Sequence, residues 1–115
     1  MGGTEPIVAT VRADVVTLIN SYPAVGSQEE LEWVKKEAED FTLNVARHFP
    51  GFISANLFET ENSVINVVQW ESKEAFQAFR SDPKVTEGIA KIEARIQPTV
   101  RVCRLYKVIP AARNT

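Results

Sequence analysis

Two side chains that can donate hydrogen bonds interrupt an apolar segment near the middle of the chain. Residues 63–70 read SVINVVQW, and their β-branched character predicts a buried strand. Side chains two apart on a strand share a face, so Asn66 and Trp70 lie among valines on one face, with Ile65 and Val67 on the other. A buried amide or indole N–H is costly unless something pairs with it. That partner is either another part of the protein or a ligand.

The elements that must position these groups follow from capping residues and apolar spacing. Ser27 and Glu30 form a capping box that begins a helix, and Pro50-Gly51 ends it. A second helical segment begins after Ser72 and starts again at Asp82-Pro83. The other predicted strands span 15–22, 52–58 and 99–109. The order β-α-β-β-α-β is that of the ferredoxin-like α+β fold, with both helices on one face of a four-stranded antiparallel sheet.

The length bounds the domain organisation. A chain of 115 residues supports one core, which we place in residues 15–109. Residues 1–14 are predicted to form an N-terminal arm with a short strand at 7–11, and residues 110–115 a polar C-terminal tail.

The second face of the predicted sheet is also apolar. An antiparallel sheet with one wet face alternates between apolar and polar residues, and this one does not. Helices of one chain cover one face only, so the other face predicts a homodimer formed by sheet-to-sheet contact. The residues assigned to it are Val15, Ile19, Ile53, Ala55, Leu57, Ile65 and Val67.

Composition and charge exclude several classes of function. The net charge of −2, without a basic block, argues against nucleic-acid binding. No apolar run reaches the ~20 residues of a membrane helix, and the start of the chain lacks signal-peptide features, so we expect a cytoplasmic protein. The single cysteine, Cys103, is expected to be buried and inert, and the single histidine, His48, to be solvated at a helix end. These two residues cannot build a metal site of the usual N/S type, and no G-x-G-x-x-G turn is present for a dinucleotide.

Four segments together resemble the antibiotic biosynthesis monooxygenase family of dimeric α/β barrels. They are TLINSY (17–22), PGFISANLF (50–58), VINVVQWESKEAF (64–76) and the helix start at Asp82-Pro83. The resemblance implies a homodimeric barrel that oxidises a phenol or anthrone, a polyketide-like aromatic molecule, to a quinone. It further implies that dioxygen is the oxidant and that no metal, haem or flavin is needed.

The resemblance also implies a set of site residues. Asn20, Asn66 and Trp70 match an asparagine, asparagine and tryptophan that serve as catalytic hydrogen-bond donors in one branch of these enzymes. Another quinone-forming branch uses a tyrosine and an arginine where this chain has Phe76 and Ile89, so no general base is identified. The substrate pocket is expected to be lined by Leu18, Phe41, Val68, Phe76, Phe79 and Ile89.

Two alternatives accompany this interpretation. Haem-degrading relatives combine matches to Asn20 and Trp70 with a histidine on iron, but that histidine falls near Gly88 here, and His48 is far away along the chain. Haem is therefore disfavoured. A non-redox binding protein, or a cyclase or isomerase on the same scaffold, is the third hypothesis.

Overall fold

The protein is described here by a computed structural model, which covers residues 14–24 and 26–112. Within these residues the elements follow in the order β-α-β-β-α-α-β, with a one-turn 3₁₀ helix after the first α-helix. The strands are β1 (Val16–Pro23), β2 (Phe52–Glu59), β3 (Ser63–Trp70) and β4 (Thr99–Arg104). The helices are α1 (Gln28–Asn44), η3 (Ala46–His48), α2 (Lys73–Ser81) and α3 (Pro83–Glu93). The predicted N-terminal arm, apart from Asp14, lies outside the described residues.

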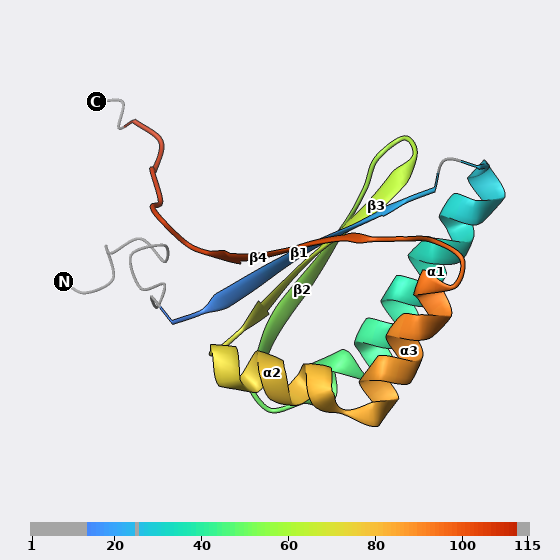
Figure 1. Ribbon diagram of the computed structural model, residues 1–115. Coiled ribbons are helices and arrows are strands. Elements are labelled where there is room, and N and C mark those ends of the chain that lie inside the picture. The colour runs from blue at the N-terminus through green and yellow to red at the C-terminus, as the bar shows by residue number, and fades with distance from the viewer. Residues whose placement is uncertain (1–13, 25, 113–115) are drawn as a thin grey trace.

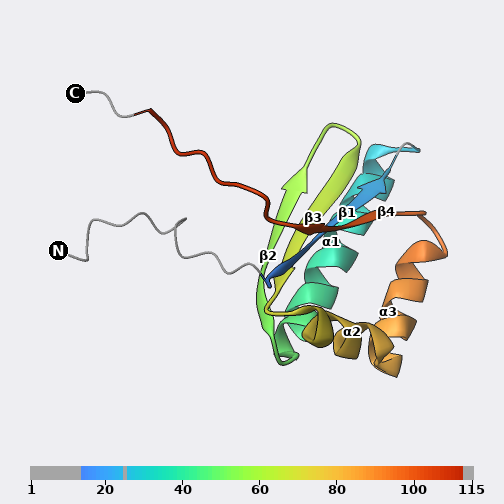
Figure 2. The same cartoon turned by 60° about the vertical axis from the view of Figure 1, so that its left-hand side comes forward.

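The strands form one antiparallel sheet in the order β2-β3-β1-β4. The helices lie on one face of this sheet (Figure 1), and the turned view leaves the other face without a described helix (Figure 2). The predicted ferredoxin-like α+β fold is confirmed. The second helical segment is divided into α2 and α3, because Asp82 between them has an extended backbone with φ −73° and ψ 133°.

Each α-helix begins where its capping residue predicts. The Ser27 hydroxyl accepts a hydrogen bond from the Glu30 N–H at 3.1 Å, and the Ser72 hydroxyl accepts one from the Ala75 N–H at 3.1 Å. The Asp82 carboxylate accepts a 2.8 Å bond from the Lys84 N–H. These bonds satisfy backbone donors that have no partner within the first helical turn.

The core lies between the helices and the helix-covered face of the sheet. Trp70 is 1% exposed, and its ring contacts Phe52 edge-on at 5.5 Å and Phe79 at 4.6 Å between centroids. A second apolar cluster packs the first half of α1 against the end of α3 and contains Leu31, Val34, Val64, Ile92 and Ile96. The alternation predicted for β3 is confirmed, since every second residue from Val64 to Trp70 is buried.

A β-bulge in β2 changes which residues face the helices. Phe52 lies opposite Trp70, but Ser54 lies opposite Gln69, so Ile53 is the extra residue. The bulge shifts the alternation of β2 by one position. Ala55 then lies opposite Val68, and Leu57 lies opposite Asn66, so both side chains are on the helix-covered face of the sheet. Our assignment of Ala55 and Leu57 to the open face was therefore wrong. Ser54, Asn56 and Phe58 occupy that face instead.

The last strand is shorter than predicted. It ends at Arg104 rather than at residue 109, because Arg104 pairs with Val16, the first residue of β1. Beyond that rung the described chain offers no neighbouring strand. Residues 105–112 leave the sheet and run away from the body of the molecule in both views (Figures 1 and 2), and Tyr106 is 95% exposed and Ile109 83% exposed.

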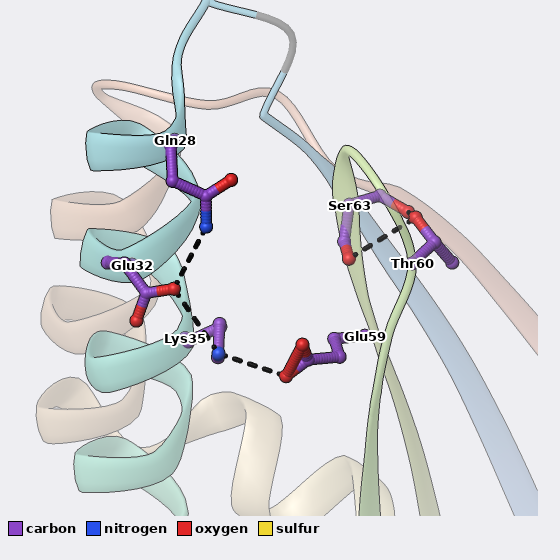
Figure 3. A network of polar contacts seen from close by, with 6 residues as sticks. All are labelled: Gln28, Glu32, Lys35, Glu59, Thr60 and Ser63. Atoms are coloured by element: carbon purple, nitrogen blue, oxygen red, sulfur yellow. Dashed lines mark hydrogen bonds and ion pairs between the residues drawn. The ribbon is translucent and has the colours of Figure 1, made fainter.

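A polar network ties α1 to the hairpin between β2 and β3 (Figure 3). The Lys35 ammonium contacts Glu59 at 2.9 Å and Glu32 at 3.4 Å. The hydroxyls of Thr60 and Ser63 share a hydrogen bond across the turn. The network lies at the surface, so we expect it to hold the hairpin near α1 while adding little to the free energy of unfolding.

Candidate active site

A cavity opens between the helix-covered face of the sheet and the three α-helices. The volume of this cavity is about 100 Å³. Every site residue predicted from the sequence lines it: Asn20, Asn66, Trp70, Leu18, Phe41, Val68, Phe76, Phe79 and Ile89. Strand alternation brings the residues of β1 and β3 to this face, and the helical stripes bring the others over it.

Two amides form one polar rung on the cavity wall. Asn20 lies directly opposite Asn66 in the antiparallel pair of β1 and β3, with the apolar rung Leu18–Val68 beside them. Side chains directly opposite across an antiparallel pair have Cβ atoms about 5 Å apart. One ligand oxygen can therefore lie within reach of both amides.

The Asn66 amide is buried without a partner for its oxygen. Asn66 is 8% exposed, and its Oδ1 is buried with no hydrogen-bond partner among the described residues. Leaving such a group unpaired costs about 1–3 kcal/mol. An amide has an acceptor oxygen and two N–H donors, and rotation by 180° about χ2 exchanges them. Asn66 can therefore offer either kind of hydrogen bond to a molecule in the cavity.

Trp70 lies farther along the same wall. Four residues of strand separate it from Asn66, which corresponds to about 13 Å along β3. Its ring is packed between Phe52 and Phe79, so it forms an aromatic wall two rungs away from the pair of amides. The cavity is therefore aromatic near Trp70 and polar at the rung of Asn20 and Asn66.

Phe41 owes its position over the cavity to Gly88. A Cβ atom built at Gly88 would lie 2.5 Å from Cε1 of Phe41, closer than real contacts allow. The Phe41 ring therefore occupies the space that a side chain at position 88 would need. It also meets Phe79 at 6.2 Å between ring centroids, in an edge-on contact that continues the aromatic wall.

The cavity also contains three titratable side chains that the sequence analysis missed: Tyr22, Arg80 and Glu93. A signal for each was present. Tyr22 follows Asn20 by two residues on the same strand and so shares its face. Arg80 lies one helical turn after Phe76, and Glu93 one turn after Ile89, at the i, i+4 spacing that places side chains side by side.

Burial and the nearby Glu93 carboxylate act on Tyr22. Burial is the larger cause, and both raise the pKa of its phenol above the ordinary value of 10.0. Tyr22 is therefore a protonated hydrogen-bond donor at neutral pH. Arg80, Glu93 and Val100 of β4 line the cavity and are exposed. The cavity therefore opens to solvent at the edge formed by these three residues.

The two residues considered for metal or thiol chemistry lie apart from the cavity. His48 is exposed in η3, and its Nε2–H donates to the Leu43 carbonyl at 3.1 Å, as expected for a solvated helix end. Cys103 is only partly buried, which corrects our expectation of a buried thiol. It pairs with Thr17 and so lies toward the open face of the sheet. The described residues contain no cluster of His, Cys, Asp or Glu that could hold a metal ion. Every helix among the described residues is too short or too polar to span a lipid bilayer.

Comparison with known proteins gives the family. The family model described as antibiotic biosynthesis monooxygenase matches residues 17–91. No curated protein sequence matches the chain significantly.

Solved structures share the fold. SnoaB, a cofactor-independent oxygenase from Streptomyces nogalater, is 25% identical, with a TM-score of 0.67 over 86% of this chain and 100% of its own. A monooxygenase from the gene ActVA-Orf6 of Streptomyces coelicolor, solved with the ligand nanaomycin D, is 23% identical, with a TM-score of 0.70 over 93% of this chain and 100% of its own. The family match covers most of the β-α-β-β-α-α-β frame and every catalytic residue predicted from the sequence. The chain therefore belongs to the antibiotic biosynthesis monooxygenase family.

Proposed function

We propose that this protein is a monooxygenase that oxidises a phenol or anthrone of polyketide-like structure to a quinone with dioxygen, without metal, flavin or haem. Family membership supports oxygenation, and the similar SnoaB is described as a cofactor-independent oxygenase. The polyketide-like substrate is suggested by the resemblance and by the aromatic wall of the cavity. Nanaomycin D, bound by the Streptomyces coelicolor relative, supports a small-molecule ligand here.

The observation that carries this proposal is the buried amide oxygen of Asn66, which has no hydrogen-bond partner among the described residues. It lies opposite Asn20 on an otherwise apolar wall, where a neutral donor can stabilise negative charge on a ligand oxygen. Low local dielectric strengthens such a bond relative to water. The flat aromatic rings of Trp70 and Phe79 favour a planar partner for the same cavity.

The reaction is balanced without a cofactor when the substrate supplies the electrons. The substrate loses a proton, and the resulting anion passes one electron to dioxygen. The substrate radical and superoxide then combine to form a carbon–oxygen bond. The peroxide takes up a proton, the remaining hydrogen at that carbon leaves as a proton, and the O–O bond breaks. One oxygen atom becomes the quinone carbonyl and the other leaves as water.

Oxygen consumption with a panel of anthrones and hydroquinones tests the proposal. We expect uptake of one O₂ per quinone formed, unchanged after treatment with a chelator. Asn66→Ala should lower kcat/KM by about 100-fold, as removal of one oxyanion donor does in other enzymes. Asn44→Ala is the matched control, because Asn44 is an exposed asparagine of α1 that lines neither the cavity nor the open face of the sheet. Ligand binding without oxygen uptake would instead favour a non-redox binding protein or a cyclase.

The structure offers no support for the haem alternative. The position that supplies the axial histidine in haem-degrading relatives falls near Gly88, and the Phe41 ring fills the space beside Gly88. Haem would also have to enter a cavity already narrowed by Phe41, Phe76 and Phe79.

We also propose that two copies associate through the open face of the sheet. Ile19, Ile65 and Val67 lie on this face beside Phe58, which is 55% exposed. The face is less apolar than the sequence suggested, since a chain of side-chain hydrogen bonds runs from Ser54 through Gln69 to Thr17. Light scattering at micromolar concentration should give the mass of a dimer, and Ile65→Glu should give a monomer. A wild-type monomer would refute the association.

A further inference from the structure

We infer that Glu93 accepts the proton that the substrate loses, and that Tyr22 donates a hydrogen bond to the oxygen left behind. The inference rests on the proposed oxygenation and supplies the general base that the asparagines and tryptophan cannot provide. An amide and an indole do not take up a proton at neutral pH.

The choice of Glu93 follows from the groups around the cavity. Among the described residues that line it, the titratable ones are Tyr22, Arg80 and Glu93. The guanidinium of Arg80 has only hydrogen-bond donors, and burial raises the pKa of the Tyr22 phenol, so neither side chain serves as a proton acceptor. The Glu93 carboxylate is therefore the lining group that can accept a proton.

The positions of these groups suit proton transfer. Tyr22 lies one rung beyond Asn20 on the same face of β1, about 7 Å along the strand. Glu93 ends α3 and is close enough to Tyr22 for its charge to act on the phenol. A ligand oxygen between the amide rung and Glu93 can thus meet donors from Asn20 and Tyr22 and an acceptor from Glu93. Because Glu93 is also exposed, its proton can exchange with water at the edge of the cavity.

The step itself transfers one proton and no net electrons. The O–H bond of a phenol, or of the enol tautomer of an anthrone, breaks. The proton passes to a carboxylate oxygen of Glu93, and the electron pair stays on the substrate oxygen. The Tyr22 hydroxyl and the amides stabilise that oxygen, and Arg80 places a positive charge at the same edge of the cavity. Glu93 is uncharged after the transfer, so it does not repel the new anion. Its proton later combines with the hydroxide that leaves when the peroxide bond breaks, giving water.

The test compares Glu93→Gln with Glu87→Gln, an exposed glutamate of α3 that does not line the cavity. Glu93→Gln should lower kcat/KM for a weakly acidic phenol by about 100-fold or more, the usual contribution of a general base. The wild-type rate should fall at acid pH, because a protonated carboxyl cannot act as a general base. The pH profile of Glu93→Gln should lack this acid limb. The rate of this variant should instead rise tenfold per pH unit as the free substrate ionises. Glu87→Gln should match the wild type, and Tyr22→Phe should lower kcat while keeping the acid limb.

Two outcomes separate this inference from the proposed function. A wild-type protein that takes up no oxygen with the whole panel refutes the oxygenase. An active wild type whose rate and pH profile persist in Glu93→Gln refutes the role of Glu93.

A binding measurement decides the matter even without turnover. Alizarin, a hydroxyanthraquinone, absorbs at different visible wavelengths as phenol and as phenolate. A neighbouring carboxylate disfavours the phenolate, so bound alizarin should ionise at higher pH in the wild type and in Glu87→Gln than in Glu93→Gln. Equal ionisation in all three proteins, or no binding of alizarin at all, would overturn the inference.

Discussion

Replacing Asn66 by leucine should make the protein more stable and less active at once. The Asn66 side chain is 8% exposed, and its Oδ1 has no hydrogen-bond partner among the described residues. Folding therefore removes water from that oxygen without a new hydrogen bond to offset the free-energy cost. Leucine has a similar branched shape and no polar group, and its larger side chain can extend into the cavity that Asn66 lines, beside the apolar rung of Leu18 and Val68.

The size of the effect follows from that unpaired group. An unsatisfied buried acceptor costs about 1–3 kcal/mol, and Asn66→Leu removes this cost. For 115 residues, an unfolding entropy of about 2.1 cal/mol/K per residue gives about 0.24 kcal/mol/K in total. The midpoint of thermal unfolding should therefore rise by about 4–12 °C. In the same variant kcat/KM should fall by about 100-fold or more, because a donor to the developing anion is lost.

The assay is thermal unfolding followed by circular dichroism, with urea unfolding at 25 °C as a second measurement. Protein concentration must be the same for all variants, since association of copies shifts the apparent stability. Asn44→Leu is the matched control: the same chemical change at an exposed position of α1, away from the cavity and from the open face of the sheet, should alter stability by about 0.5 kcal/mol or less. A loss of 1 kcal/mol or more in Asn66→Leu would show that the amide stabilises the fold itself, and the ligand-facing role of Asn66 would then be refuted.

Three further predictions concern a turn, a phenol and haem. Gly51→Ala should destabilise the protein by at least about 1 kcal/mol in urea unfolding, because Gly51 has φ +86° and its Cβ would lie 2.4 Å from the Ala75 Cβ. Gly26→Ala, where the nearest atom is a flexible Glu30 carboxylate oxygen at 3.2 Å, should cost less, and equal losses would contradict this reasoning. Because the pKa of Tyr22 is raised above 10.0, the folded state keeps a proton that the unfolded state loses. The free energy of unfolding should fall as pH rises from about 10 through the raised pKa, and Tyr22→Phe should show a smaller fall between pH 9 and pH 11.5. Haemin titration should give no stoichiometric Soret shift, since Phe41 fills the space beside Gly88, and a sharp shift with ascorbate-dependent bleaching would contradict this.

The sequence alone was sufficient to predict the helix starts and the inward-facing residues of β3. Capping by Ser27, Ser72 and Asp82 depends on hydrogen bonds within three residues, so no distant part of the chain is needed to recognise it. The alternation from Val64 to Trp70 is equally local, because every second side chain of a strand must share a face. These two periodicities explain why the predicted site residues line one cavity.

Three features were decided by the tertiary structure. The bulge at Ile53 moves Ala55 and Leu57 to the helix side, and it depends on how β2 pairs with β3 rather than on the residues of β2 alone. The end of β4 at Arg104 depends on where β1 begins. Tyr22, Arg80 and Glu93 come from β1, α2 and α3, and their meeting at one edge of the cavity depends on how α2 and α3 pack over the sheet. Local periodicity determines which face a side chain takes on its own element, whereas register and packing, which join residues distant in the chain, determine what lies opposite that face.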